Sequence, residues 1–253
     1  MDSCGVAENA ISASSASVKI GILGGIGHGA TCEFYNKLIK ELQKRKLIKR
    51  NTDYPHIIIN SIPASELVRN KISSPDLKPY VEGVKLLDKI GVDFIVMVCN
   101  TIHLYFRLLQ REIKTPILDL RKEVRLALIS KRKRVLVLGT PATITRGLYE
   151  FPGIKYSRLG KKEMNDISDS ILQFNQGFIA LQGNNLSEIC RKRIKNGTQI
   201  ILACTELSLM LEKEGIPNIS TLDILVYNKY KGRQNKTNRS RLISQTKLMN
   251  LPE

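Results

Sequence analysis

Short, almost wholly apolar runs recur along the chain, and most are followed by a stretch with apolar residues at helical spacing. The runs predict strands at 18–23, 56–60, 92–98, 134–138 and 199–203. The spacing predicts helices at 30–46, 79–90, 101–113, 122–130, 163–181 and 186–196. Strands that are apolar on both faces are typical of parallel sheets covered by helices. The alternation therefore predicts an α/β fold built from mostly parallel sheets.

Two features of this pattern occur twice, about 105 to 115 residues apart. A strand followed by a glycine loop occurs at Gly24 and again at Gly139. An apolar strand followed by a cysteine occurs at Cys99 and again at Cys204. Ligands bind at the carboxyl ends of strands in open parallel sheets. We therefore expect two similar halves whose glycine loops and cysteines meet in one cleft.

The repeat divides the chain into segments of different character. We predict one α/β domain over 18–115 and a second over 116–205, with part of 206–228 packing back on the first. Residues 1–17 are rich in Ser and Ala without periodicity, which predicts a disordered tail. Residues 229–253 form a polar, basic C-terminal tail.

Composition and charge limit the possible classes of protein. The chain has 253 residues, 42% of them hydrophobic, and no apolar run long enough to cross a bilayer. Its first residues do not resemble a secretory signal, so we expect a cytoplasmic protein. Five cysteines without a C-x-x-C pattern favour free thiols over a disulfide framework or a zinc site. No His, Cys, Asp or Glu cluster has metal-ligand spacing, so we predict no metal.

The formal net charge of +17 is concentrated in three stretches, 37–50, 121–134 and 229–253. Such stretches can bind nucleic acid, but no known nucleic-acid-binding motif accompanies them. Solvated helix faces and a basic tail are the favoured interpretation, and nucleic-acid binding stays open. A basic surface would also attract a small anionic substrate.

The first glycine loop has two functional interpretations and one structural one. Gly25, Gly27 and Ala30 satisfy the dinucleotide pattern G-x-G-x-x-A. That interpretation requires an acidic residue at the end of the second strand, which instead ends at Asn60 and Ser61. Backbone N–H groups at a helix start can equally hold a carboxylate. Gly25, Gly27 and Asn60 are therefore candidate substrate contacts, and a purely structural tight turn remains possible.

Cys99 and Cys204 indicate a functional site more strongly than the glycine loop does. A single cysteine after an apolar strand is usually a small buried hydrophobe. Two cysteines at equivalent positions of a repeat instead favour a functional role for both. A helix N-terminus beside each is expected to lower the pKa of its thiol. His103, one helical turn after Cys99, and Glu206, two residues after Cys204, could assist a thiolate or serve the local structure.

These residues occur in motifs that resemble those of the aspartate/glutamate racemase family. The resemblance rests on four segments in order: Ile22-Leu23-Gly24-Gly25-Ile26-Gly27, Cys99-Asn100-Thr101-Ile102-His103, Gly139-Thr140 with Thr143, and Cys204-Thr205-Glu206-Leu207. It covers about 19–223. Two departures are His28-Gly29 after the glycine loop and the basic segment after Asp223.

The resemblance implies two pseudosymmetric α/β domains, a homodimer and catalysis without a cofactor. It implies that Cys99 and Cys204 transfer protons to and from an acidic amino acid. The residues implied to hold its carboxylates and amine are Asn100, Thr101, Thr140, Thr143 and Thr205. Two alternatives remain open: a two-cysteine isomerase or decarboxylase of a small dicarboxylate, and a binding protein without activity.

Overall fold

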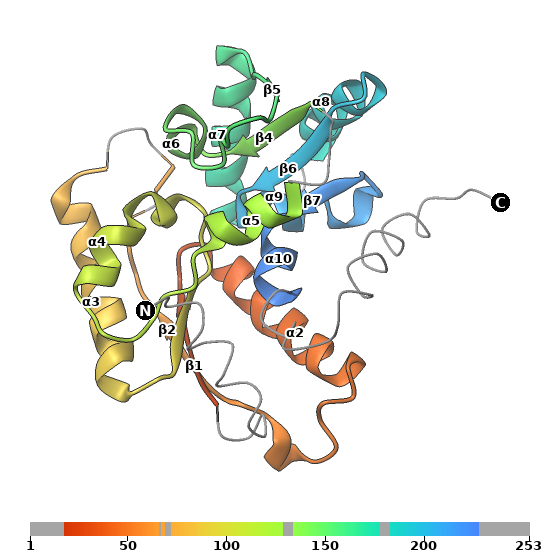
Figure 1. Cartoon of the computed structure of the whole chain (residues 1–253). Helices are drawn as coiled ribbons and strands as arrows, with labels where there is room; N and C mark the ends of the chain where they lie inside the picture. The colour runs from red at the N-terminus through yellow and green to blue at the C-terminus, as the bar shows by residue number, and fades with distance from the viewer. Residues whose placement is uncertain (1–17, 66, 69–71, 129–133, 178–182, 228–253) are drawn as a thin grey trace.

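The fold consists of two parallel sheets, each flanked by helices (Figure 1). A computed structural model describes residues 18–65, 67–68, 72–128, 134–177 and 183–227. The first sheet has the order β2-β1-β3, with strands His56–Ser61, Lys19–Gly24 and Phe94–Met97. The second has the order β5-β4-β6-β7, with strands Tyr156–Ser157, Val135–Gly139, Gln199–Ala203 and Asn218–Ser220. All the pairings are parallel, which confirms the predicted fold class.

The two sheets repeat one arrangement. Strands β1 and β4 each lie centrally and lead into a glycine loop, while β3 and β6 each pair with them and lead into a cysteine. Ile117 bridges Ile95 of β3 in parallel, just as β7 pairs with β6. Ile117, two residues beyond the domain boundary predicted at 115, thus lies at the edge of the first sheet. The boundary itself stays a prediction.

The helices follow the predicted pattern, with differences at their ends. They are α2 (His28–Lys44), α3 (Ser74–Ile90), α4 (Phe106–Arg111), α5 (Leu120–Leu128), α6 (Pro141–Thr145), α7 (Lys161–Asn175), α8 (Gly183–Lys195), α9 (Thr205–Met210) and α10 (Thr221–Tyr227). The described residues also form the short 3-10 helices η2 (Asn51–Asp53), η3 (Thr101–Tyr105) and η4 (Glu212–Glu214).

Several predicted helix limits were wrong. Helix α3 begins five residues before the predicted start at 79, because Ser73 and Asp76 form a capping box at its first turn. The segment after Cys99 begins as the 3-10 helix η3 before α4 follows. The sequence pattern did not predict β5, β7 or α10, which are all short. The predicted tails, 1–17 and 229–253, lie outside the described residues.

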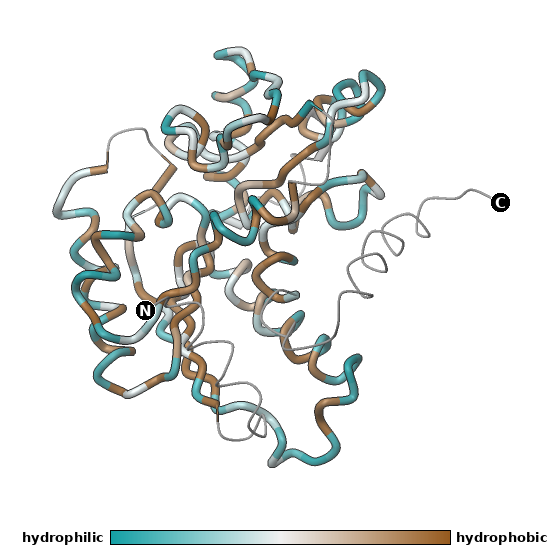
Figure 2. The backbone as a smooth tube through the Cα atoms, in the orientation of Figure 1, coloured by the Kyte–Doolittle hydropathy of each residue, from teal (hydrophilic) through white to brown (hydrophobic). Residues whose placement is uncertain are grey.

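Alternation along the strands divides the core into three clusters. Val96 and Val98 of the first half share a buried cluster with Ile201 and Ala203 of the second, so one core joins both sheets. Cys99 faces the opposite way, into a cluster beneath α3. Cys204 likewise faces a separate cluster that includes residues of α7 and α8. Figure 2 shows the strands as the most continuously hydrophobic part of the chain.

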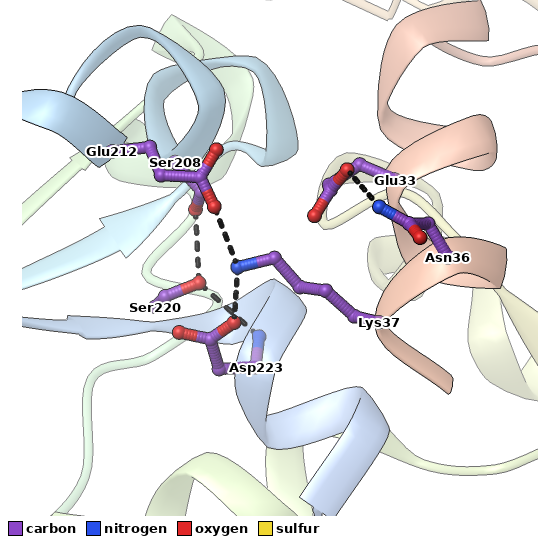
Figure 3. Close-up of polar contacts among 7 residues, drawn as sticks. All are labelled: Glu33, Asn36, Lys37, Ser208, Glu212, Ser220 and Asp223. Atoms are coloured by element: carbon purple, nitrogen blue, oxygen red, sulfur yellow. Dashed lines mark hydrogen bonds and ion pairs between the residues drawn. The ribbon is translucent and has the colours of Figure 1, made fainter. Parts of the chain in front are cut away.

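Helix α10 and an ion-pair cluster also join the halves. Helix α10 packs against α2 and α5 (Figure 1). Nζ of Lys37 on α2 lies 2.9 Å from Oδ1 of Asp223 and 3.2 Å from Oε1 of Glu212 (Figure 3). Oγ of Ser220 accepts a hydrogen bond from the Asp223 backbone N–H, which orients the start of α10. The C-terminal segment is therefore tied to the N-terminal half by charge as well as by packing.

No helix in the described part of the chain combines the length and the apolar character that a bilayer crossing requires.

Candidate active site

Cys99 and Cys204 both lie just beyond the carboxyl end of a strand, where the two halves meet. Cys99 follows β3 and is 8% exposed, while Cys204 follows β6 and is 6% exposed. Burial raises the pKa of Cys204, and Glu206 and Cys99 add to the increase. Both cysteines are buried, and their predicted meeting in one cleft stays a prediction.

The motif after Cys99 contacts the second half. Oγ1 of Thr101 lies 2.9 Å from Oγ1 of Thr140 and 3.0 Å from Oγ1 of Thr143. Thr140 is the N-cap of α6, and its Oγ1 also accepts a hydrogen bond from the Thr143 backbone N–H. All three threonines are buried. Three predicted substrate contacts from both halves therefore form one hydroxyl cluster.

The motif after Cys204 contacts the first half in the corresponding way. Sγ of Cys204 donates a hydrogen bond to Oε2 of Glu206 at 2.8 Å, and Oγ1 of Thr205 donates to the same oxygen at 3.0 Å. The other carboxylate oxygen, Oε1, lies where a Cβ on Gly27 would be. Gly27 has φ +90°, a conformation that favours glycine. Each cysteine motif thus reaches the glycine loop of the opposite half.

The predicted lowering of the thiol pKa values was wrong. Burial, followed by the charge of Glu206, raises the pKa of Cys99 to about 12, although backbone N–H groups of η3 act in the opposite direction. Burial and Glu206 also raise the pKa of Cys204 well above its ordinary value. Removal from water outweighs the short helix starts, so both cysteines are neutral thiols in this structure.

The other predicted site residues, Gly25, Asn60 and His103, differ from one another in their hydrogen-bond contacts. The backbone N–H of Gly25 donates a hydrogen bond to Oγ1 of Thr31, so this N–H already has an acceptor within the protein. The side chain of Asn60 donates to the backbone oxygen of Gly83 on α3. His103 is fully buried, and neither of its ring nitrogens has a hydrogen-bond partner among the described residues.

The charged groups that act on His103 are Asp119 and Arg121. Burial, the larger effect, lowers the pKa of His103 to about 4. The two charged groups belong to the segment before and within α5. The assisting role of His103 stays a prediction.

One residue of the site escaped the sequence pattern. The hydroxyl of Tyr149 donates a hydrogen bond to Oδ1 of Asn100 at 2.5 Å, and both side chains are buried. Burial, and then the charges of Cys99 and other groups including Cys204, raise the pKa of Tyr149 well above its ordinary value. Tyr149 lies in an irregular segment that also contains Phe151, and no motif distinguishes it from a core residue.

Two cavities lie in and beside the second half. A cavity of about 20 Å³ lies beside Thr143 and Tyr149, and another of about 220 Å³ lies between α2 and α10. Neither is lined by a cysteine. Val68, from the segment between β2 and α3, is buried in the same cluster as Cys204. Within the described residues, no group of three His, Cys, Asp or Glu side chains is arranged to hold a metal ion.

The fold and the paired cysteine motifs define a two-half α/β protein with a buried thiol site at the junction. Residues 23–227 match the model of the Asp/Glu/Hydantoin racemase family. The chain belongs to this family, and it is an enzyme of the amino-acid racemase type.

Individual relatives agree with this assignment. The broad specificity amino-acid racemase RacX of Bacillus subtilis (strain 168) is 32% identical over 202 residues, which cover 76% of this chain and 87% of RacX. The structure of Picrophilus torridus aspartate racemase superposes with a TM-score of 0.71 at 25% identity, covering 88% of this chain and 98% of that one. An aspartate racemase homologue from Pyrococcus horikoshii OT3 gives a TM-score of 0.63 at 26% identity, covering 90% and 99%.

Proposed function

We propose that the chain racemises an acidic amino acid, aspartate or glutamate, with Cys99 and Cys204 as the two acid/base groups. The supporting observation is that the motif after each cysteine contacts the opposite half: Thr101 is hydrogen-bonded to Thr140 and Thr143, and the carboxylate of Glu206 lies against Gly27. Racemisation removes the Cα proton from one face and returns a proton to the other. Two groups on opposite sides of one carbon can do this without either having to move across the substrate.

In the proposed reaction, one cysteine acts as thiolate and takes the Cα proton, while the other acts as thiol and donates a proton to the opposite face. The roles exchange when the other enantiomer is the substrate. The carbanion is stabilised as its α-carboxylate gains enolate character and accepts hydrogen bonds from nearby donors. The proposed donors are Asn100, Thr101, Thr140, Thr143 and Thr205, whose side chains lie around the junction. Both proton transfers are thus assigned to side chains, without a cofactor.

A thiolate must first be generated, because burial and Glu206 keep both thiols protonated in this structure. Glu206 is hydrogen-bonded to the thiol of Cys204, and in the proposed reaction it takes the proton of that thiol. The ammonium group of an incoming amino acid brings the positive charge that a thiolate requires. Admission of the substrate also requires the junction to open, as at many sites that exclude water during the reaction.

Two observations support an acidic substrate, and one favours an alternative. The net charge of +17 attracts anions, and the Picrophilus torridus relative is named an aspartate racemase. RacX, in contrast, is named a broad specificity racemase. An amino-acid racemase with a wide substrate range is therefore the second candidate.

Chiral chromatography tests the proposal. Purified full-length protein is incubated without added PLP with L-Asp, L-Glu and a panel of neutral and basic L-amino acids. We expect D-Asp or D-Glu to accumulate faster than any other D-amino acid, and Cys99→Ser and Cys204→Ser to abolish the reaction. Comparable rates across the panel would favour broad specificity. Full activity in either serine variant would contradict the two-thiol mechanism.

A parallel assay with maleate and substituted malonates tests the isomerase and decarboxylase alternatives. We expect neither compound to be converted. Light scattering on the same protein tests the predicted homodimer, for which we expect twice the mass of one chain.

A further inference from the structure

We propose that Tyr149 is a positioning residue that fixes the side-chain amide of Asn100, so that its NH₂ group is presented to the substrate's α-carboxylate. The proposal rests on the racemase function proposed above. It assigns a role in the reaction to a residue that contacts neither thiol by a hydrogen bond.

The first step is the direction of the hydrogen bond between the two side chains. A phenol is protonated at neutral pH, and burial together with the nearby thiols raises the pKa of Tyr149 further. The hydroxyl therefore carries a proton that requires an acceptor. Oδ1 of Asn100, 2.5 Å away, accepts it. The carbonyl side of the amide is thereby turned toward Tyr149, and the nitrogen side is turned away.

The second step is the state of that nitrogen. Asn100 is 2% exposed, and its Nδ2 has no hydrogen-bond partner among the described residues. A buried NH₂ group without a partner is unfavourable in a folded protein. If the amide could rotate freely, it would relieve this by exchanging its two ends. The bond from Tyr149 prevents the exchange and keeps a buried donor available for a ligand.

The third step is the position of the donor. Asn100 lies between Cys99 and Thr101 in the chain, and Thr101 belongs to the hydroxyl cluster. Asn100 directly follows Cys99, so the amide that the phenol holds lies beside the first cysteine and next to the cluster that joins Thr101 to Thr140 and Thr143 of the second half. A donor at this place would face the oxygen on which negative charge develops as the Cα proton leaves.

A second tyrosine bonds only to the backbone of the segment that contains Tyr149. The hydroxyl of Tyr156 donates to the backbone oxygen of Tyr149 at 2.7 Å and accepts from the Phe151 N–H at 3.0 Å. Tyr156 thus supports the same segment without contacting Asn100 through a hydrogen bond. This makes Tyr156→Phe the matched control, since it removes an equivalent hydroxyl and only structural hydrogen bonds.

The test measures kcat and KM for both enantiomers, together with thermal stability, in the full chain. We expect Tyr149→Phe to lower kcat/KM by about tenfold or more, because the oriented donor is lost. Tyr156→Phe should lower the melting temperature and leave kcat/KM within about twofold of the wild type. In an Asn100→Ala background, adding Tyr149→Phe should change kcat/KM by less than about twofold, because both act through one amide.

A second variant keeps the test valid if Tyr149→Phe does not fold. Asn100→Asp retains an oxygen that accepts from Tyr149 but replaces the NH₂ donor by an acceptor. We expect it to fold and to lose at least as much kcat/KM as Tyr149→Phe. Unchanged kcat/KM in Asn100→Asp, or in folded Tyr149→Phe, would overturn the inference while the racemase function stands. An inactive wild-type protein would instead overturn the proposed function, and this inference with it.

Discussion

The carboxylate of Glu206 occupies the space in which a side chain at Gly27 would lie, so a residue after β6 completes the glycine loop after β1. The same carboxylate accepts the hydrogen bond from the Cys204 thiol and raises the pKa of Cys99. One acidic group in the second half therefore links the first-half loop to both thiols. This relationship explains the need for a glycine at position 27 without a dinucleotide.

Gly27→Ala should disturb the site through this contact. The new Cβ would collide with Glu206 at a residue with φ +90°. We expect a loss of about 1 to 3 kcal/mol in the free energy of unfolding and at least a tenfold drop in kcat/KM. Gly29→Ala is the matched control, because its Cβ would lie 3.6 Å from Leu209, an ordinary contact. Denaturant unfolding and the racemase assay check both variants, and equal effects of the two would contradict this interpretation.

Glu206→Gln separates the effect of the carboxylate on the thiol pKa values from its proposed role as acceptor of the Cys204 proton. Removing its negative charge should lower the pKa of both Cys99 and Cys204, because that charge raises both values. Alkylation of the two thiols, followed by mass spectrometry, should therefore begin at lower pH than in the wild type. Racemase activity should nevertheless fall, by about a hundredfold in kcat, because the group that takes the Cys204 proton is lost. Unchanged activity would exclude Glu206 from the proton path.

Lys37→Met tests the ion-pair cluster between α2 and the C-terminal segment. Burial lowers the pKa of Lys37, but hydrogen bonds and charges of Asp223 and Glu212 outweigh it and raise the pKa above 10.5. The pairs thus stabilise the fold below about pH 10.5, and this stabilisation is lost as the pH rises through the raised pKa. Because the partners are partly exposed, we expect a loss of only about 1 kcal/mol at pH 7. Thermal unfolding against pH checks this, with exposed Lys40→Met as the control.

His103 should make the protein sensitive to acid. Burial lowers its pKa from 6.5 to about 4, so below pH 6.5 the unfolded chain binds a proton that the folded protein does not. Stability should fall by up to about 3 kcal/mol between pH 6.5 and 4. His103→Leu should flatten that part of the curve, whereas His56→Leu, at an exposed position, should leave it unchanged. A parallel decline in His103→Leu would assign the acid sensitivity to other groups.

Periodicity alone was enough to predict two similar parallel sheets and a cysteine directly after one strand of each. The strands before Cys99 and Cys204 are apolar on both faces, a pattern that depends only on local sequence. The pKa of each thiol could not be predicted in the same way. Its sign depends on how completely water is excluded and on where Glu206 lies, and both are properties of the assembled junction.

Residues that act through partners distant in sequence also escaped prediction. Tyr149 lies 49 positions from Asn100, and its hydroxyl is informative only once that contact is formed. Helix α10 is too short for a reliable periodic pattern and is positioned by packing against α2 and α5. The hydrogen bond from the Asn60 amide to the backbone of α3, 23 positions away, escaped prediction as well, and the substrate contact of Asn60 stays a prediction.

The most direct test of the two-thiol mechanism is the exchange of the Cα hydrogen in D₂O, measured separately for L- and D-aspartate by mass spectrometry. In Cys99→Ser and Cys204→Ser, inversion should be lost, and each variant should retain exchange for one enantiomer only. The two variants should retain opposite enantiomers, because each keeps a thiol on one face of the carbon. Exchange of the same enantiomer in both variants, or inversion at the wild-type rate in either, would contradict the mechanism.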